Sequence, residues 1–212
     1  MTVDRSRTRR RRNSLNLDEI LDAAERVAAD GIESLTIRAV AEQLGASPMG
    51  LYRHVAGKDE LIDLLLDRVL GRMPTVPETA DPLHDLACFA RTHRDLLADH
   101  PWAVPALVAR AAPGPNAVPI GEQCLNILAR AGVQGGEAVA VFSGVLALNY
   151  GWMSFALGRR RPEASASLAR IEAGPRGDFP RTAAAGPELA QFGSDRHYDV
   201  VLARLCGLPG SA

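Results

Sequence analysis

The chain has 212 residues, of which 47% are hydrophobic and 5% aromatic, and its formal net charge is −1. Alanine and leucine dominate the apolar residues and β-branched runs are scarce, which favours an all-α fold over a sheet-based one. The near-neutral total excludes a protein that is a polycation throughout, so a surface that binds phosphate must be local.

The first 13 residues form a basic arm. They carry Arg5, Arg7 and four consecutive arginines, 9–12, against one acid, Asp4. Like charges this close repel one another, so we expect residues 1–13 to be disordered. The arm either lies along phosphates or in a minor groove, or it is only a solubilising tail. A neighbouring nucleic-acid-binding motif favours the first reading.

An amphipathic helix is predicted after the arm. Asn16 and Glu19 have the spacing of a capping box, in which each side chain bonds the backbone N–H of the other residue. Gly31 lies where the helix should end. Between them, apolar residues recur at helical spacing, and these are Leu17, Ile20, Leu21, Ala24, Val27 and Ala28.

Two short helices separated by a tight turn are predicted over residues 36–58. Thr36 can cap the first helix through its hydroxyl, and Gly45 can end it because a residue without Cβ adopts the left-handed conformation easily. Ser47 can cap the second helix, with Pro48 at its first position, where a missing N–H costs nothing.

The spacing of three residues indicates how these two helices pack. Ala41 is small enough to let the second helix cross closely, Gly45 forms the turn, and Leu51 fills the space between the helices. The second helix then points its exposed residues outward, as a recognition helix does toward a DNA major groove. An ordinary αα-hairpin in a helical core matches the same positions, so this spacing alone leaves both readings open.

A longer, ungapped series of motifs favours DNA binding. It consists of residues 31–38, 41–45, 51–55 and 58–61, and the Leu-Tyr-x-His-Val string at 51–55 is its specific part. The series resembles the N-terminal domain of the TetR family of bacterial transcription regulators over roughly residues 14–72. The resemblance implies that residues 14–73 form a domain that binds double-stranded operator DNA.

The resemblance also implies which residues contact DNA. Arg38 matches the family position that reaches a guanine edge, where arginine can form two hydrogen bonds. Pro48, Met49 and Gly50 occupy the base-reading positions and have no polar side chain, so methyl contacts, Arg53 or DNA shape would carry the sequence readout. Positions that contact phosphate and set register match Thr36, Tyr52, His54 and Lys58, and Ser47 completes the predicted interface. Tyr52 has an alternative role as a core packing residue.

A helix over residues 58–73 is predicted next. It is more apolar than a three-helix domain requires, so it should also pack on the next domain and connect the two. Three prolines at the following positions exclude a helix, and we place the domain boundary in this linker, residues 74–82.

Residues 83–208 are predicted to form a second helical domain. Its first helices are expected over residues 83–100, 104–112 and 118–131, with a sharp loop at 112–116. The breaks at residues 100–102 and 114–116 resemble the C-terminal domain of the tetracycline-repressor subgroup over roughly residues 83–157. This looser resemblance implies a domain that binds a small-molecule effector and forms dimers.

An uncharged stretch from Ala138 to Gly158 has two readings. Its length and composition suffice for a membrane span, but it contains Ser143, Asn149 and Tyr150, and no second span accompanies it. A helix that is apolar all round can instead be buried between its own domain and a second subunit. The family resemblance implies a dimer-forming helix here, so we expect a homodimer and no membrane.

The last part of the chain is expected to divide in two. Residues 159–187 hold few large apolar groups, so we expect a mobile segment with at most one short helix, 163–172. A last helix over 187–208 should pair with the 138–158 helix. These two helices from each subunit would form a four-helix interface with two-fold symmetry.

The effector site is predicted only in outline. An apolar cavity between helices is the default pocket. The polar and aromatic residues expected on its walls are Phe89, His93, Trp102, Arg110, Asn126, Asn149 and Trp152, each of which also has a purely structural reading. Family members that hold a magnesium–tetracycline complex use a histidine in the short helix that matches Ala106–Arg110. No histidine occurs there, which argues against that ligand.

Other functions are weaker alternatives. The sequence has no pairing of a nucleophile with a base, no Gly-rich phosphate loop and no metal-ligand spacing, so we predict no catalytic residue, no metal and no cofactor. The cysteines follow no disulfide pattern and no signal peptide is apparent, which favours a cytoplasmic protein. A helical enzyme or carrier, and an architectural DNA-binding protein without a ligand, are the competing hypotheses.

Overall fold

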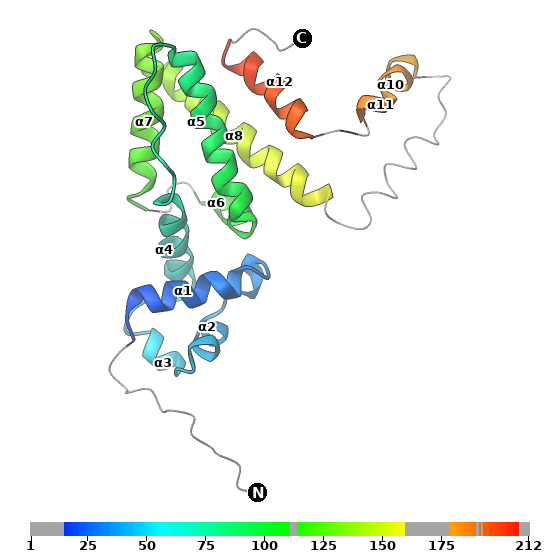
Figure 1. Ribbon diagram of the computed structural model, residues 1–212. Coiled ribbons are helices and arrows are strands. Elements are labelled where there is room, and N and C mark those ends of the chain that lie inside the picture. The colour runs from blue at the N-terminus through cyan, green and yellow to red at the C-terminus, as the bar shows by residue number, and fades with distance from the viewer. Residues whose placement is uncertain (1–14, 111–113, 160–178, 190, 192, 208–212) are drawn as a thin grey trace, which may run out of the picture. The chain divides into compact units, whose positions relative to one another are not determined.

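Figure 1 shows the computed structural model, which describes residues 15–110, 114–159, 179–189, 191 and 193–207. These residues contain helices and turns but no β-strand, so the predicted all-α class is confirmed. The basic arm at 1–13 and the short helix expected at 163–172 lie outside the described residues. The chain divides into two compact units, residues 1–65 and 66–212, so the division falls ahead of the linker where we placed the boundary.

The first unit is built from α1 (Leu17–Ala28), the short 3₁₀ helix η1 (Ile32–Ser34), α2 (Ile37–Leu44) and α3 (Pro48–Leu51). The predicted capping box at the start of α1 is present, with the Asn16 side chain accepting a hydrogen bond from the Glu19 N–H at 2.8 Å. α1 packs against α2, and α2 against α3. The core of the unit contains Ile20, Leu35, Val40 and Leu51, all fully buried, whereas Leu17 at the start of the predicted stripe is partly exposed.

The helix that follows, α4 (Lys58–Leu70), contains the division between the two units. It ends earlier than the predicted residue 73, because the N–H groups of Arg72 and Met73 bond the carbonyls three residues back and tighten the chain into turns. The apolar residues on which this prediction rested are buried, and these include Leu61, Ile62, Leu65 and Val69. Residues 71–81 contain no helix, in agreement with the prolines.

The second unit contains α5 (Pro82–Asp99), the 3₁₀ helix η2 (Pro101–Ala103), α6 (Val104–Ala109), α7 (Ala117–Arg130), α8 (Gly135–Arg159) and α12 (Asp195–Leu205). α5 packs against both α7 and α8, and α7 also packs against α8. α12 lies against α5 and α8, so the predicted pairing of the last helix with the apolar helix is confirmed (Figure 1).

The C-terminal helices differ from the prediction of one helix over 187–208. The structure instead has α11 (Gly186–Leu189) and α12, separated by a break. Gly193 has a φ of 73°, and the Ser194 side chain accepts a hydrogen bond from the His197 N–H at 3.4 Å as the N-cap of α12. A further short helix, α10 (Pro180–Ala184), lies in the segment where we expected no helix beyond residue 172.

The helix α8 is the one stretch of the described residues that is long and apolar enough to cross a membrane. Within Gly135–Gly158 the mean hydropathy reaches 1.4, and 22% of the tested window of 18 residues is buried within the chain. The core helix of a protein assembly meets the same test of length and composition. The apolar character of α8 is therefore weak support for a membrane span.

Candidate functional site

The first candidate site is the helix-turn-helix of α2 and α3. The Thr36 hydroxyl accepts a hydrogen bond from the Ala39 N–H at 3.0 Å, and the Ser47 hydroxyl accepts one from the Gly50 N–H at 3.3 Å. Between the two caps, Gly45 has a φ of 63°, in the left-handed region that favours glycine. Each local feature predicted for this motif is therefore present.

The helix α3 has four residues, and a turn over residues 52–54 follows it directly. The N–H groups of His54 and Val55 both bond the Leu51 carbonyl, at 2.8 and 3.1 Å. Leu51 and Val55 are buried, as their spacing predicted. Tyr52 is 51% exposed, so its alternative role as a core residue is excluded within this chain.

The residues predicted to contact DNA are exposed or partly exposed in the first unit. Met49 is 74% exposed. The side chains of Thr36, Arg38, Ser47, Pro48, Arg53, His54 and Lys58 are exposed as well, and Gly50 is partly so. No acidic residue occurs between positions 43 and 58, whereas Arg53 and Lys58 lie there. Arg38, Arg53 and Lys58 are the exposed basic residues of this set, and basic side chains are what binding to phosphate requires.

The second candidate site is a buried polar network between α5, α8 and α12. The Tyr198 hydroxyl donates a hydrogen bond to Asn149 Oδ1 at 2.7 Å. Asn149 Nδ2 donates in turn to His93 Nδ1 at 3.0 Å and to the Ala90 carbonyl at 2.9 Å. His93 and Asn149 are buried, and burial lowers the pKa of His93 to about 4. The imidazole is therefore neutral at pH 7 and accepts through Nδ1.

Aromatic rings surround this network. The rings of Trp152 and Tyr198 meet edge to face with centroids 5.6 Å apart, and those of His93 and Tyr150 at 5.7 Å. The Arg94 guanidinium lies 4.2 Å from the centre of the Tyr198 ring. The Trp152 indole N–H is buried and has no hydrogen-bond partner among the described residues. An unsatisfied buried donor of this kind is uncommon in proteins.

Three of the seven residues predicted for the effector site therefore meet around one network: His93, Asn149 and Trp152. Phe89 packs near Phe142 and Trp102 near His100, while Arg110 lies at the end of α6 and Asn126 lines a separate groove on α7. The prediction missed Tyr150 and Tyr198, although Tyr198 and Leu202 have the i, i+4 spacing of buried residues.

The comparison with protein families decides what kind of protein this is. Residues 20–65 match the model of bacterial regulatory proteins of the tetR family, and residues 76–208 match the tetracyclin repressor-like C-terminal domain. The chain belongs to the TetR family. The predicted resemblance is thus confirmed over both parts of the chain, and the helix-turn-helix is the DNA-binding element of this family of transcriptional regulators.

Curated relatives of this family member are regulators as well. An HTH-type transcriptional regulator of Saccharopolyspora erythraea is 36% identical over 138 residues, which are 64% of this chain and 58% of the relative. The HTH-type transcriptional repressor DrrR1 of Streptomyces coeruleorubidus is 36% identical over 130 residues, 60% of this chain and 48% of the relative. The chain spans about half the length of the curated relatives that it matches.

Solved structures share the fold. ActR from Streptomyces coelicolor in complex with actinorhodin has a TM-score of 0.83 and 23% identity, over 92% of this chain and 95% of that one. Apo ActR has a TM-score of 0.81, also at 23% identity, over 91% of this chain and 93% of that one. At 23% identity, this likeness supports the TetR fold, but it does not show which ligand this chain binds.

Proposed function

We propose that this protein is a cytoplasmic, homodimeric repressor without a catalytic role, which binds operator DNA through α3 and releases it when a small molecule binds the second unit. The observation that carries the proposal is a helix-turn-helix whose caps and left-handed turn are all in place and whose Arg38, Arg53 and Lys58 are exposed. In a dimer, two such motifs would read half-sites about 34 Å apart or multiples of that distance.

Exposed apolar residues support a dimer through α8 and α12. Tyr198 and Leu202 on α12 are buried, whereas the neighbouring stripe with Val201 and Leu205 is 41% and 40% exposed. On α8, Phe155 is likewise exposed. Burying such a surface against a second copy removes apolar area from water at about 25 cal/mol per Å². We expect Val201→Glu to yield monomers in sedimentation experiments, while Val118→Glu, at an exposed valine of α7, leaves the dimer intact.

A contact inside the second unit supports a route from effector to α4. Asp67 on α4 accepts hydrogen bonds from the Asn116 backbone N–H at 2.7 Å and from its side-chain amide at 2.8 Å. A Cβ on Gly114 would lie 2.4 Å from the Asp67 carboxyl, so this close approach requires glycine. A ligand that moves the start of α7 would therefore move α4, and a small rotation of α4 would change the spacing of the recognition helices.

The network of α5, α8 and α12 favours an aromatic effector with a hydrogen-bond acceptor. The Trp152 indole N–H, which has no hydrogen-bond partner among the described residues, would gain one from such a ligand. ActR, which has the same fold, was solved with actinorhodin.

The test is a gel-shift measurement on the DNA that flanks the gene of this protein, with and without a panel of lipophilic aromatic molecules. A shift that one compound releases while the protein stays dimeric would support the whole proposal. A ligand that binds without altering operator affinity would contradict release by an effector. The absence of any shift at low salt, where phosphate contacts are strongest, would contradict DNA binding itself.

Two variants separate specific contacts from general charge. Lys58→Ala should weaken binding to all sequences about equally and reduce the slope of log affinity against log salt by about 1, because one phosphate contact is lost. Arg26→Ala removes one positive charge from the last turn of α1 and serves as the matched control. Equal salt slopes for the two variants would remove Lys58 from the interface.

A further inference from the structure

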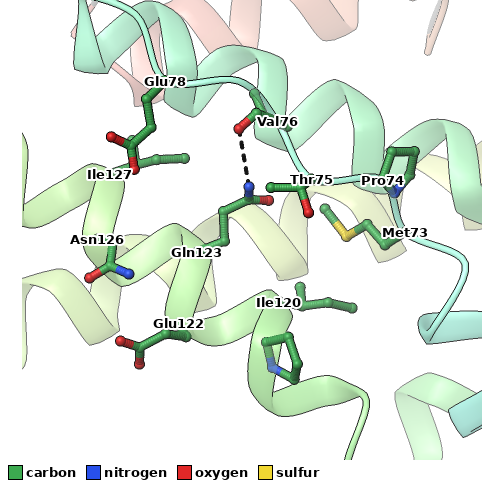
Figure 2. Close-up of a pocket in the computed structure, with 11 residues that line it drawn as sticks. Met73, Pro74, Thr75, Val76, Glu78, Ile120, Glu122, Gln123, Asn126 and Ile127 are labelled. Atoms are coloured by element: carbon green, nitrogen blue, oxygen red, sulfur yellow. Dashed lines mark hydrogen bonds between the residues drawn. The ribbon is translucent and has the colours of Figure 1, made fainter.

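A groove on the second unit lies away from the polar network described above. It runs between the chain segment 73–78, which follows α4, and the outer side of α7, and it has a volume of about 320 Å³ (Figure 2). This volume is at the lower end of the range for small-molecule sites. Several lining residues are exposed, among them Pro74, Thr75 and Pro119, so solvent reaches the groove.

The two sides of the groove differ in chemistry. Figure 2 shows Met73, Pro74 and Ile120 together on one side. On the other side, Glu78 and Glu122 lie at opposite ends, with the Asn126 amide between them. Val76, Ile120 and Ile127 are the buried apolar residues of the lining. The groove therefore offers an apolar surface with an acidic edge.

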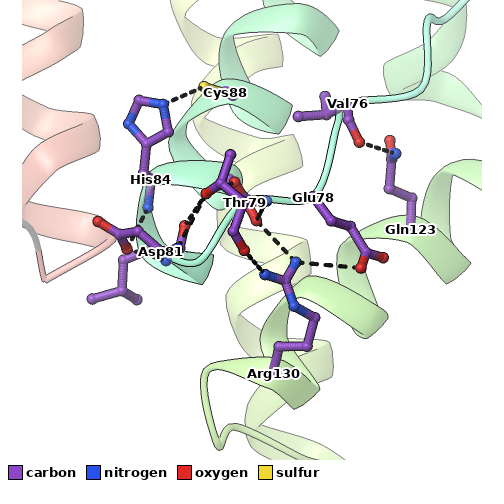
Figure 3. Close-up of polar contacts among 10 residues, drawn as sticks. Val76, Glu78, Thr79, Asp81, His84, Cys88, Gln123 and Arg130 are labelled. Carbon is purple, nitrogen blue, oxygen red and sulfur yellow. Dashed lines mark hydrogen bonds and ion pairs between the residues drawn. The ribbon is translucent and has the colours of Figure 1, made fainter.

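Hydrogen bonds fix the segment that forms one wall. Gln123 on α7 donates from Nε2 to the Val76 carbonyl at 3.2 Å. Further along, the buried Asp85 carboxylate accepts from the Thr79 hydroxyl at 2.6 Å and from the Thr79 N–H at 3.0 Å (Figure 3). Arg130 donates to the Thr79 carbonyl and to Asp85, the latter at 2.9 Å. The wall is thus held before any ligand arrives, which lowers the entropic cost of binding.

The same interactions leave the negative charge of the acidic edge only partly neutralised. Arg130 lies 2.9 Å from Asp85 but 3.9 Å from Glu78, so its charge is matched first by the buried Asp85. Among the described residues that line the groove, Glu78 and Glu122 are acidic and none is basic. The site therefore has a negative potential beside an apolar surface, which attracts a positively charged and largely apolar molecule.

We propose that this groove binds an amphipathic organic cation, with its apolar body against Met73, Pro74 and Ile120 and its positive group at the acidic edge, beside Glu122. Such a ligand displaces water from the apolar lining and is also attracted by the acidic edge, whereas a neutral molecule of equal shape gains only from the apolar contact. The proposal concerns binding at this groove and does not depend on DNA recognition or on the aromatic network.

Isothermal titration calorimetry of the full chain tests the proposal with tetraphenylphosphonium and its neutral relative triphenylphosphine oxide. We expect the cation to bind saturably with one site per chain, and the neutral molecule to bind at least about five-fold more weakly. Glu122→Gln should weaken cation binding about three-fold, as expected for one exposed charge pair. Glu137→Gln, the same change at an exposed residue of α8 outside the lining, should leave the affinity unaltered.

Asn126 allows the sign of the charge to be reversed at one exposed position. Asn126→Asp should strengthen cation binding about three-fold, and Asn126→Arg should weaken it about ten-fold, because opposite charges are placed at the same edge. Circular dichroism melting checks that both variants fold. The proposal is overturned if the cation does not bind, or if it binds with the same affinity to Asn126→Asp, Asn126→Arg and the unchanged chain.

Discussion

The two candidate sites of this protein are assembled over very different distances along the chain. In the helix-turn-helix, the cap hydrogen bonds of Thr36 and Ser47 each join residues three positions apart. In the network of the second unit, Asn149 bonds residues 49 to 59 positions away. The first site depends on local backbone chemistry, and the second depends on how α5, α8 and α12 pack together.

This difference predicts that the two units respond to different substitutions, and the tryptophans make the response measurable. Trp102 and Trp152, the only tryptophans in the sequence, belong to the second unit. Tryptophan fluorescence during urea unfolding therefore reports on that unit, whereas DNA binding reports on the first. A chain with two units need not unfold in one step. The unfolding of each unit is therefore followed with the probe that reports on that unit.

The largest effect is expected for Asn149→Leu. The substitution leaves the Tyr198 hydroxyl, His93 Nδ1 and the Ala90 carbonyl without a shared buried partner, at a cost of about 4 kcal/mol. Urea unfolding followed by tryptophan fluorescence measures this loss. Ser143→Ala, at an exposed position of the same helix, should change the free energy of unfolding by less than about 0.5 kcal/mol. Similar values for both variants would contradict the network.

A core substitution in the first unit should give the opposite pattern. Leu51→Ala removes a fully buried side chain between α2 and α3, and we expect a cost of about 3 kcal/mol. Operator binding in the gel-shift assay should be lost, while the fluorescence transition of the second unit stays unchanged. A shift of that transition by the same amount would show that the two units unfold together.

The buried His93 makes the stability of the second unit depend on pH. Its pKa is lowered from 6.5 to about 4 by burial, so between these values the unfolded chain binds a proton that the folded chain does not. Stability is therefore lost as the pH falls below about 6.5. The loss between pH 7 and pH 5 should be about 2 kcal/mol. Urea unfolding of His93→Gln should lack this component, and an equal pH dependence in the variant would contradict a neutral His93.

The smallest effect concerns the turn of the first unit. Gly45→Ala places a side chain at a φ of 63° and should cost about 1 kcal/mol. Gly50 is the matched control, because it lies in α3 and an added Cβ would meet only the Ser47 hydroxyl oxygen at 3.6 Å. Thermal melting followed by far-UV circular dichroism should show a lower midpoint for Gly45→Ala than for Gly50→Ala. The reverse order would contradict the left-handed turn.

Most helices could be predicted because their ends are encoded by neighbouring residues. The capping box at Asn16 and the caps at Thr36 and Ser47 are confirmed. The break before α12 was missed although its signal is local, a left-handed Gly193 followed by the cap Ser194. There, the apolar pattern of residues 187–208 was given more weight than the turn residues.

The amino-acid sequence by itself therefore determined the helical class, the caps and turn of the helix-turn-helix, and the exposed residues of α3. Only the tertiary structure decided that His93 and Asn149 meet Tyr198, that Asp67 holds Asn116, and that the chain after α4 forms a groove with α7. The physical reason is that a cap depends on residues three positions apart, which the helix geometry brings together. A contact across about 50 residues exists only when the packing of several helices has placed both side chains at one point.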